Sequence, residues 1–166
     1  MIPVNALKKA ITYAEPWTTL NTEADMLKIL VPVDGSECAV RAVREAIKVA
    51  NDSKGAQLHL LNVQLPLISG HAKMFLRHNE LQSYYQAEGE AALATVLPVV
   101  AESGIPFESE MRTGQYGETI ANYAKEKQCD RIVMGTRGLG AVGGLLLGSV
   151  ARKVIHLADV PITLVK

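Results

Sequence analysis

Residues 131–158 read RIVMGTRGLGAVGGLLLGSVARKVIHLA. The apolar run at the start of this stretch predicts a short buried strand. A loop with five glycines follows between Gly135 and Gly144, and Gly148-Ser149 then begins a helix with apolar side chains at helical spacing. A strand, a glycine-rich loop and a helix in this order present backbone N–H groups and the positive end of a helix to an anion. The sequence therefore predicts a phosphate-binding loop.

The charges of this stretch support that interpretation. No acidic residue occurs between Asp130 and Asp159, whereas four basic residues do: Arg131, Arg137, Arg152 and Lys153. The whole chain has 17 basic and 17 acidic residues, so the excess is local. Arg137, together with Arg152 or Lys153, is expected to add charge-assisted hydrogen bonds to an anion. The alternative is a flexible connection in which Ser149 only caps the last helix.

The rest of the chain alternates predicted strands and helices. Further strands are expected at Leu27–Val33, Ala56–Val63, Phe107–Arg112 and Val160–Val165, and helices from the N-cap Ser36 to Asn51, at Glu80–Glu102 with a kink at Pro98, and at Tyr116–Lys127. Strands that alternate with helices predict a parallel sheet with helices on both faces, in one α/β domain. Because the strand at 107–112 alternates polar and apolar residues, we expect it near an edge.

Open parallel sheets bind ligands at the carboxyl ends of their strands, where the strand order reverses. Asp34 follows the first strand and Gly135 follows the fourth, so both can lie at that crevice. Asp34 is either a ligand-binding group or only the turn former of the Asp34-Gly35-Ser36 sequence.

Two common nucleotide fingerprints do not explain the glycines. Residues 138–143 match G-x-G-x-x-G, but only one strand follows them, which leaves no room for the βαβ unit and acidic ribose ligand of a dinucleotide site. The Walker pattern G-x-x-x-x-G-K-[ST] is absent from the sequence.

A third pattern does match. Gly135-x2-Gly138-x9-Gly148-Ser149 resembles the G-2x-G-9x-G-(S/T) motif of the ATP-binding branch of the universal stress protein family. The resemblance extends over roughly residues 27–166 and includes the first strand and turn, the end of the second strand and the closing strand. Residues 1–25 are an addition to the usual family pattern, so we expect an N-terminal extension (1–25) followed by a universal stress protein domain (26–166).

The resemblance implies a five-stranded parallel sheet of order 3-2-1-4-5 that binds ATP, with Mg or Mn, and forms a homodimer through strand 160–165. It assigns the adenosine end of ATP to Pro32, Val33 and Asp34, the flanks of the adenine to Val63 and Met134, the ribose and first phosphates to Gly135, Arg137 and Gly138, and the outer phosphates to Gly148, Ser149 and Val150. The family commonly has a histidine near Asn62, so the resemblance assigns that side chain no role.

The function implied is that of a nucleotide-dependent sensor or regulator in a stress response. Alternatives are a slow ATPase or nucleotide-dependent transferase, or a dimerisation module that binds no nucleotide. No carboxylate near the loop is placed to act as a base, which argues against efficient catalysis.

Composition limits the partners and the location. The balanced charge gives no reason to expect nucleic acid as a partner, and no apolar run reaches the roughly 20 residues that a membrane span requires. No signal peptide is recognisable in the first residues. Cys38 and Cys129, without metal-ligand spacing, fit a reducing compartment. We therefore expect a cytoplasmic protein.

Overall fold

The computed structural model describes residues 26–66, 78–139 and 147–166, and for residues 78–82 it describes the backbone alone. The predicted N-terminal extension and three glycines of the predicted loop, Gly140, Gly143 and Gly144, lie outside these ranges.

Strands and helices alternate along the described chain, as the sequence predicts. Their bounds are β1 (Leu27–Pro32), α2 (Glu37–Asn51), β2 (Ala56–Gln64), α4 (His78–Ala94), α5 (Leu97–Ser103), β3 (Phe107–Thr113), α6 (Tyr116–Glu126), β4 (Arg131–Gly135), α7 (Ser149–Leu157) and β5 (Ile162–Val165). Ser36 caps α2 as expected, since its Oγ accepts a hydrogen bond from the Ala39 N–H at 3.2 Å.

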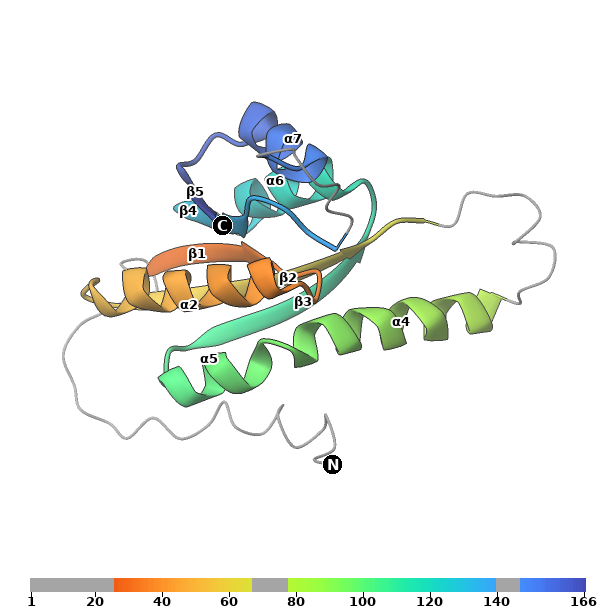
Figure 1. Ribbon diagram of the computed structural model, residues 1–166, viewed down its shortest axis with the longest axis horizontal. Helices are drawn as coiled ribbons and strands as arrows, with labels where there is room; N and C mark the ends of the chain where they lie inside the picture. Colours follow the sequence, from red (N-terminus) through yellow and green to blue (C-terminus); the bar gives the residue numbers. More distant parts are fainter. Residues whose placement is uncertain (1–25, 67–77, 140–146) are drawn as a thin grey trace.

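The five strands form one sheet of order β3-β2-β1-β4-β5, in which every neighbouring pair is parallel. This confirms the predicted fold class and strand order, and it confirms β3 as an edge strand. In Figure 1, β1, β2 and β3 run from left to right, and because β4 and β5 are parallel to them, the carboxyl ends of all five strands share the right-hand side of the sheet.

Helices cover both faces of the sheet. Figure 1 shows α6 and α7 on one side of the strands, with α2, α4 and α5 on the other. Successive side chains of a strand point to opposite faces, so each strand contributes to two cores. In β1, Ile29 and Val31 pack with α2 and α5, whereas Leu30 packs with α6 and α7. Burial on both faces explains why β1 and β2 are almost continuously apolar.

The prediction of a single kinked helix over Glu80–Glu102 was wrong, because the structure has two separate helices there, α4 and α5. The chain leaves the helical path after Ala94 and resumes as α5 at Leu97. Pro98 has no N–H to donate to the carbonyl of Ala94, and its ring would clash with that carbonyl. The fixed φ of Pro98 suits the first turn of α5 instead. The helix pair ends as predicted, at Gly104 with φ of 70°.

On α4, Tyr84 is 51% exposed. Within the ranges described, no helix is both long and apolar enough to cross a membrane.

Candidate functional site

The strand order reverses between β1 and β4. The chain leaves β1 for α2 on one face of the sheet and leaves β4 for α7 on the other face. In open parallel sheets the segments that follow two such strands separate, and the crevice for a ligand lies at this carboxyl edge. Asp34 and Gly135, predicted from the sequence to meet here, do lie at these two strand ends.

Asp34 joins the two sides of the crevice. Its Oδ1 accepts a hydrogen bond from the Ser36 N–H at 3.0 Å, which forms the turn before α2. Its Oδ2 accepts from the Leu139 N–H, also at 3.0 Å, in the loop that follows β4. Asp34 therefore forms the turn before α2, as one of the two interpretations of the sequence predicted. Its bond to Leu139 also attaches the glycine loop to the end of β1. A carboxylate has about four lone-pair sites, so Asp34 can still accept a bond from a ligand.

Two glycines allow the loop to approach this closely. A Cβ on Gly138 would overlap the Asp34 carboxylate. A Cβ on Gly135 would lie 2.8 Å from Cys38 Cβ on α2 and 3.0 Å from the Arg137 carbonyl oxygen. The first two glycines of the predicted motif are thus required by packing in the absence of any ligand.

The third glycine begins α7. Gly148 is the N-cap residue, and its N–H donates to the Thr136 carbonyl at 2.8 Å, which holds the helix start against the end of β4. Ser149 is the first residue of the helix, so it does not occupy the cap position that the alternative assigned to it. Among the residues that the structure describes, no side chain caps α7, in contrast to α2. The amides of its first turn, at Ser149 and Val150, can therefore donate to an anion.

Buried apolar side chains lie at the strand ends, on both faces of the sheet. Val33, Val63 and Met134 have 2%, 8% and 5% of their surface exposed, at the ends of β1, β2 and β4. Val63 and Met134 belong to the core cluster that packs against α6 and α7, whereas Val33 belongs to the cluster on the α2 face. Pro32 is half-buried beside them.

A family comparison agrees with this geometry. Residues 26–166 match the sequence pattern of the universal stress protein family. The chain belongs to that family. It is 36% identical over 139 residues to a universal stress protein of Thermus aquaticus, covering 83% of this chain and 97% of the relative. It is 33% identical over 141 residues to the universal stress protein MJ0531 of Methanocaldococcus jannaschii, covering 84% and 81%.

Solved structures show the same fold. Universal stress protein UspA from Lactobacillus plantarum superposes with a TM-score of 0.73 at 28% identity and covers 87% of this chain and 100% of its own. The hypothetical protein MJ0577 superposes with a TM-score of 0.74 at 27% identity, covering 86% and 96%.

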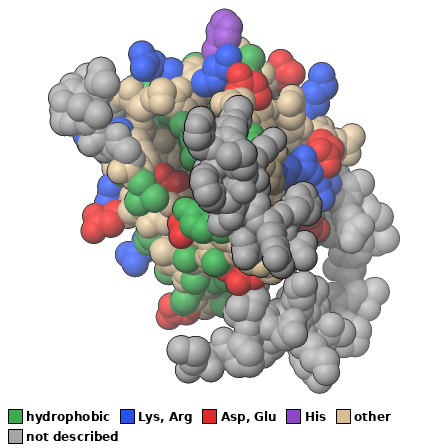
Figure 2. Space-filling model, turned by 90° about the vertical axis from the view of Figure 1, so that its right-hand side faces the viewer, with side chains coloured by type: hydrophobic (Ala, Val, Ile, Leu, Met, Phe, Trp, Pro, Cys, Tyr) green, Lys and Arg blue, Asp and Glu red, His purple; other side chains and the backbone are tan. Residues whose placement is uncertain are grey.

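The basic residues of this universal stress protein divide into two groups. Lys153 Nζ lies 3.1 Å from Glu118 Oε1 on α6, so its charge is partly engaged there. Arg137 and Arg152 are exposed. The carboxyl edge, viewed in Figure 2, shows Lys and Arg side chains interspersed with Asp and Glu over its described part, so no broad surface of one sign forms there. Of the predicted basic groups, Arg137 and Arg152 remain available to an anion.

One polar contact beside the site was not predicted from the sequence. Asn62 is 2% exposed, and its Nδ2 donates to the Val33 carbonyl oxygen at 2.8 Å. This bond connects β2 to the residue that directly follows β1. The available signal was an asparagine within the apolar strand LHLLNV, because a buried amide needs a hydrogen-bond partner.

The cysteines lie in different environments. Cys38 is half-buried at the start of α2, where Arg41 Nη2 donates to its Sγ at 2.9 Å. Burial raises the pKa of the Cys129 thiol to about 11, so Cys129 is protonated at neutral pH. Among the described residues, no cluster of three or more His, Cys, Asp or Glu side chains is suited to a metal ion.

Proposed function

We propose that this universal stress protein binds ATP, with Mg or Mn, and works as a nucleotide-dependent sensor or regulator in a stress response. The observation that carries the proposal is the start of α7. Its cap is a glycine, no side chain in the described ranges satisfies its first-turn amides, and the carbonyl of Thr136 fixes it beside the end of β4. A phosphate group satisfies such amides and interacts favourably with the helix dipole.

A second observation supports a ligand at the same place. The hydroxyl of Thr136 is buried, and no partner for it exists in the described part of the chain. Such groups are uncommon in folded proteins. Together with the exposed Arg137 and the buried Val63 and Met134, these strand ends have the chemistry of a nucleotide site: apolar at one end and donor-rich at the other.

Two proteins of the same fold have been solved with adenine nucleotides. They are a universal stress protein in complex with cAMP and an Arabidopsis thaliana universal stress protein with AMP bound, each with a TM-score of 0.59. In our proposal the triphosphate lies along Gly138, Gly148, Ser149 and Val150 and carries the divalent cation. The nucleoside lies between Val63 and Met134, with Pro32, Val33 and Asp34 at its edge and Gly135 and Arg137 at the ribose.

The hydrogen bonds of Asp34 favour a sensor of ATP over an enzyme that hydrolyses it. Both oxygens of Asp34 already accept backbone N–H bonds, so it is poorly placed to remove a proton from an attacking water. A phosphate assay with excess ATP separates the two functions. We expect no turnover or slow hydrolysis at most.

The test of binding is a thermal shift with ATP and MgCl₂. We expect the wild type to be stabilised, and by roughly 2.7 kcal/mol when ATP is present at 100 times its Kd. The Gly148→Val, Ser149→Ala variant should lose the shift, because the side chain introduced at position 148 lies against the Thr136 carbonyl, 3.3 Å from an ideal Cβ. Ser109→Ala on the edge strand is the matched control. An unchanged melting temperature of the wild type at millimolar ATP would rule the proposal out.

We also propose that the protein forms a homodimer through β5. β5 is the second edge of the sheet and carries Leu164, which is 38% exposed, and the preceding helix α7 exposes Ile155 and Leu157. Pairing of β5 with a second copy would cover these side chains and satisfy the free strand edge. We further propose that residues 1–25 are an extension of the domain at 26–166, and that the protein acts in the cytoplasm.

A further inference from the structure

Two side-chain amides at the carboxyl end of β2 have their orientation fixed by one backbone carbonyl. The Val33 carbonyl oxygen can only accept hydrogen bonds, so Asn62 presents its NH₂ group to it, at 2.8 Å. Asn62 Oδ1 in turn accepts a hydrogen bond from Gln64 Nε2 at 2.8 Å. Because Asn62 is buried, water cannot replace these bonds at low cost. Gln64 therefore has its carbonyl oxygen Oε1 to offer to a ligand.

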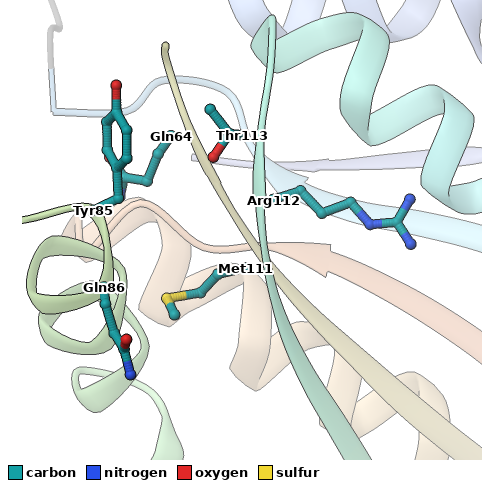
Figure 3. A pocket seen from close by; sticks show the side chains of 6 residues that line it. All are labelled: Gln64, Tyr85, Gln86, Met111, Arg112 and Thr113. Atoms are coloured by element: carbon teal, nitrogen blue, oxygen red, sulfur yellow. The ribbon is translucent and has the colours of Figure 1, made fainter. Parts of the chain in front are cut away.

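Gln64 lies in a cavity between β2, β3 and α4. The cavity has a volume of about 150 Å³ and is lined by Gln64, Tyr85, Gln86, Met111, Arg112 and Thr113. In Figure 3, Gln64 and Thr113 lie at the carboxyl ends of β2 and β3 beside Tyr85. The cavity is on the α4 face of the sheet, whereas the residues proposed to flank the base of ATP, Val63 and Met134, belong to the α6 and α7 face. It is therefore a separate place from the proposed nucleotide site.

The cavity offers no charge to a ligand from the described residues that line it. Arg112 is the charged residue among them, and its guanidinium points to the opposite side of β3 (Figure 3). There it donates two hydrogen bonds to Glu126, at 2.6 and 2.8 Å, and one to Glu110, at 2.7 Å. A charged ligand in the cavity would lose hydration without gaining an opposite charge. The occupant is therefore neutral.

The polar groups of the lining favour a ligand with several donors. Gln86 Nε2 donates to Glu90 Oε1 at 3.0 Å, so Gln86, like Gln64, has its amide oxygen left to accept a hydrogen bond. The Thr113 hydroxyl can donate or accept. A hydrocarbon in the cavity would leave these groups without partners, which is costly wherever it also displaces water.

We propose that this cavity binds a neutral ring-shaped polyol, a pyranose sugar or a cyclitol. An apolar cavity of about 150 Å³ holds one benzene molecule, so this volume accommodates a single six-membered ring. Each hydroxyl group on such a ring can donate to an amide oxygen of Gln64 or Gln86, and its C–H groups can pack against the ring of Tyr85. The inference is independent of the proposed function, because it uses none of the residues assigned to ATP.

Saturation-transfer difference NMR on the full chain without nucleotide tests the proposal. The probes are D-glucose, D-galactose, D-mannose and myo-inositol, and cyclohexanol serves as a ring with a single hydroxyl. We expect transfer to the ring protons of at least one polyol, with a Kd of order millimolar, and none to cyclohexanol. Gln64→Met keeps the length of the side chain and removes the acceptor, so it should weaken polyol binding at least about fivefold. Gln57→Met is the matched control, since Gln57 lies on the same strand and donates to Glu108 at 3.3 Å, outside the cavity.

Three results would overturn the inference: no transfer to any of the polyols, equal transfer to cyclohexanol, or unchanged polyol affinity in Gln64→Met. If Gln64→Met is poorly folded, Thr113→Val at an exposed position takes its place and should weaken binding in the same way. The Gly148→Val, Ser149→Ala variant should keep the polyol affinity of the wild type. Loss of binding in that variant would assign the polyol to the ribose part of the nucleotide site instead, whereas failure of the wild type to bind ATP would refute the proposed function alone.

Discussion

Gly138→Ala tests whether Asp34 holds the glycine loop. An alanine Cβ at this position would overlap the Asp34 carboxylate, so either the carboxylate or the loop must move. Loop movement breaks the 3.0 Å bond from the Leu139 N–H, and rotation of the carboxylate also breaks the 3.0 Å bond from Ser36. At roughly 1 kcal/mol for each partly exposed bond, the free energy of unfolding should fall by about 1–2 kcal/mol. For a domain of this size, the melting temperature should fall by about 3–8 °C.

A double-mutant cycle identifies the contact responsible. Asp34→Ala removes the group that the new methyl would meet, so Gly138→Ala should then cost less than about 0.5 kcal/mol. Urea unfolding of the four proteins, followed by circular dichroism without nucleotide, gives the coupling energy. A cost of Gly138→Ala that is the same with and without Asp34 would refute the assignment of Asp34 as the residue that joins the loop to β1.

Two further predictions concern pH and assembly. His59 on β2 is 3% exposed, with Tyr123 Oη 3.3 Å and Glu108 Oε2 3.8 Å from its Nδ1, and Lys28, Glu110 and Lys127 are the other charges that act on it. Burial lowers the pKa of His59 in the folded chain below the ordinary value of 6.5. As the pH falls below 6.5, His59 is therefore protonated in the unfolded chain before it is protonated in the folded chain. This difference lowers the free energy of unfolding as the pH falls. Urea unfolding between pH 7 and 5 should show this loss in the wild type and a flatter profile in His59→Leu, whereas the control His156→Gln, at an exposed position, should keep the wild-type slope. Leu164→Arg places a charge on the exposed edge of β5 and should convert the proposed dimer to a monomer with an unchanged circular dichroism spectrum. Light scattering measures the change, and a variant that stays dimeric would exclude β5 as the interface.

The sequence predicted the elements of the fold because their signals are local. Apolar runs such as LKILVP and RIVM, separated by helical periodicity, identify buried parallel strands, and the alternation in Phe107–Arg112 identified the edge strand. The strand order came from the resemblance to universal stress proteins. The helix prediction over Glu80–Glu102 was wrong at Thr95–Val96, although the cause, Pro98, was visible in the sequence. Where a chain resumes after a proline depends on packing, and here the fully buried Val96 fixes the break.

For the site, the sequence by itself determined which residue types are present and how they are spaced: three glycines at motif positions, a serine at the start of a helix and an aspartate after the first strand. Only the tertiary structure decided which of them touch. Asp34 and Leu139 are 105 positions apart, and Asn62 lies 29 positions from Val33, yet both pairs are hydrogen-bonded at one edge of the sheet. A spacing pattern carries no information about such contacts, because they depend on the parallel pairing that brings the ends of β1, β2 and β4 together.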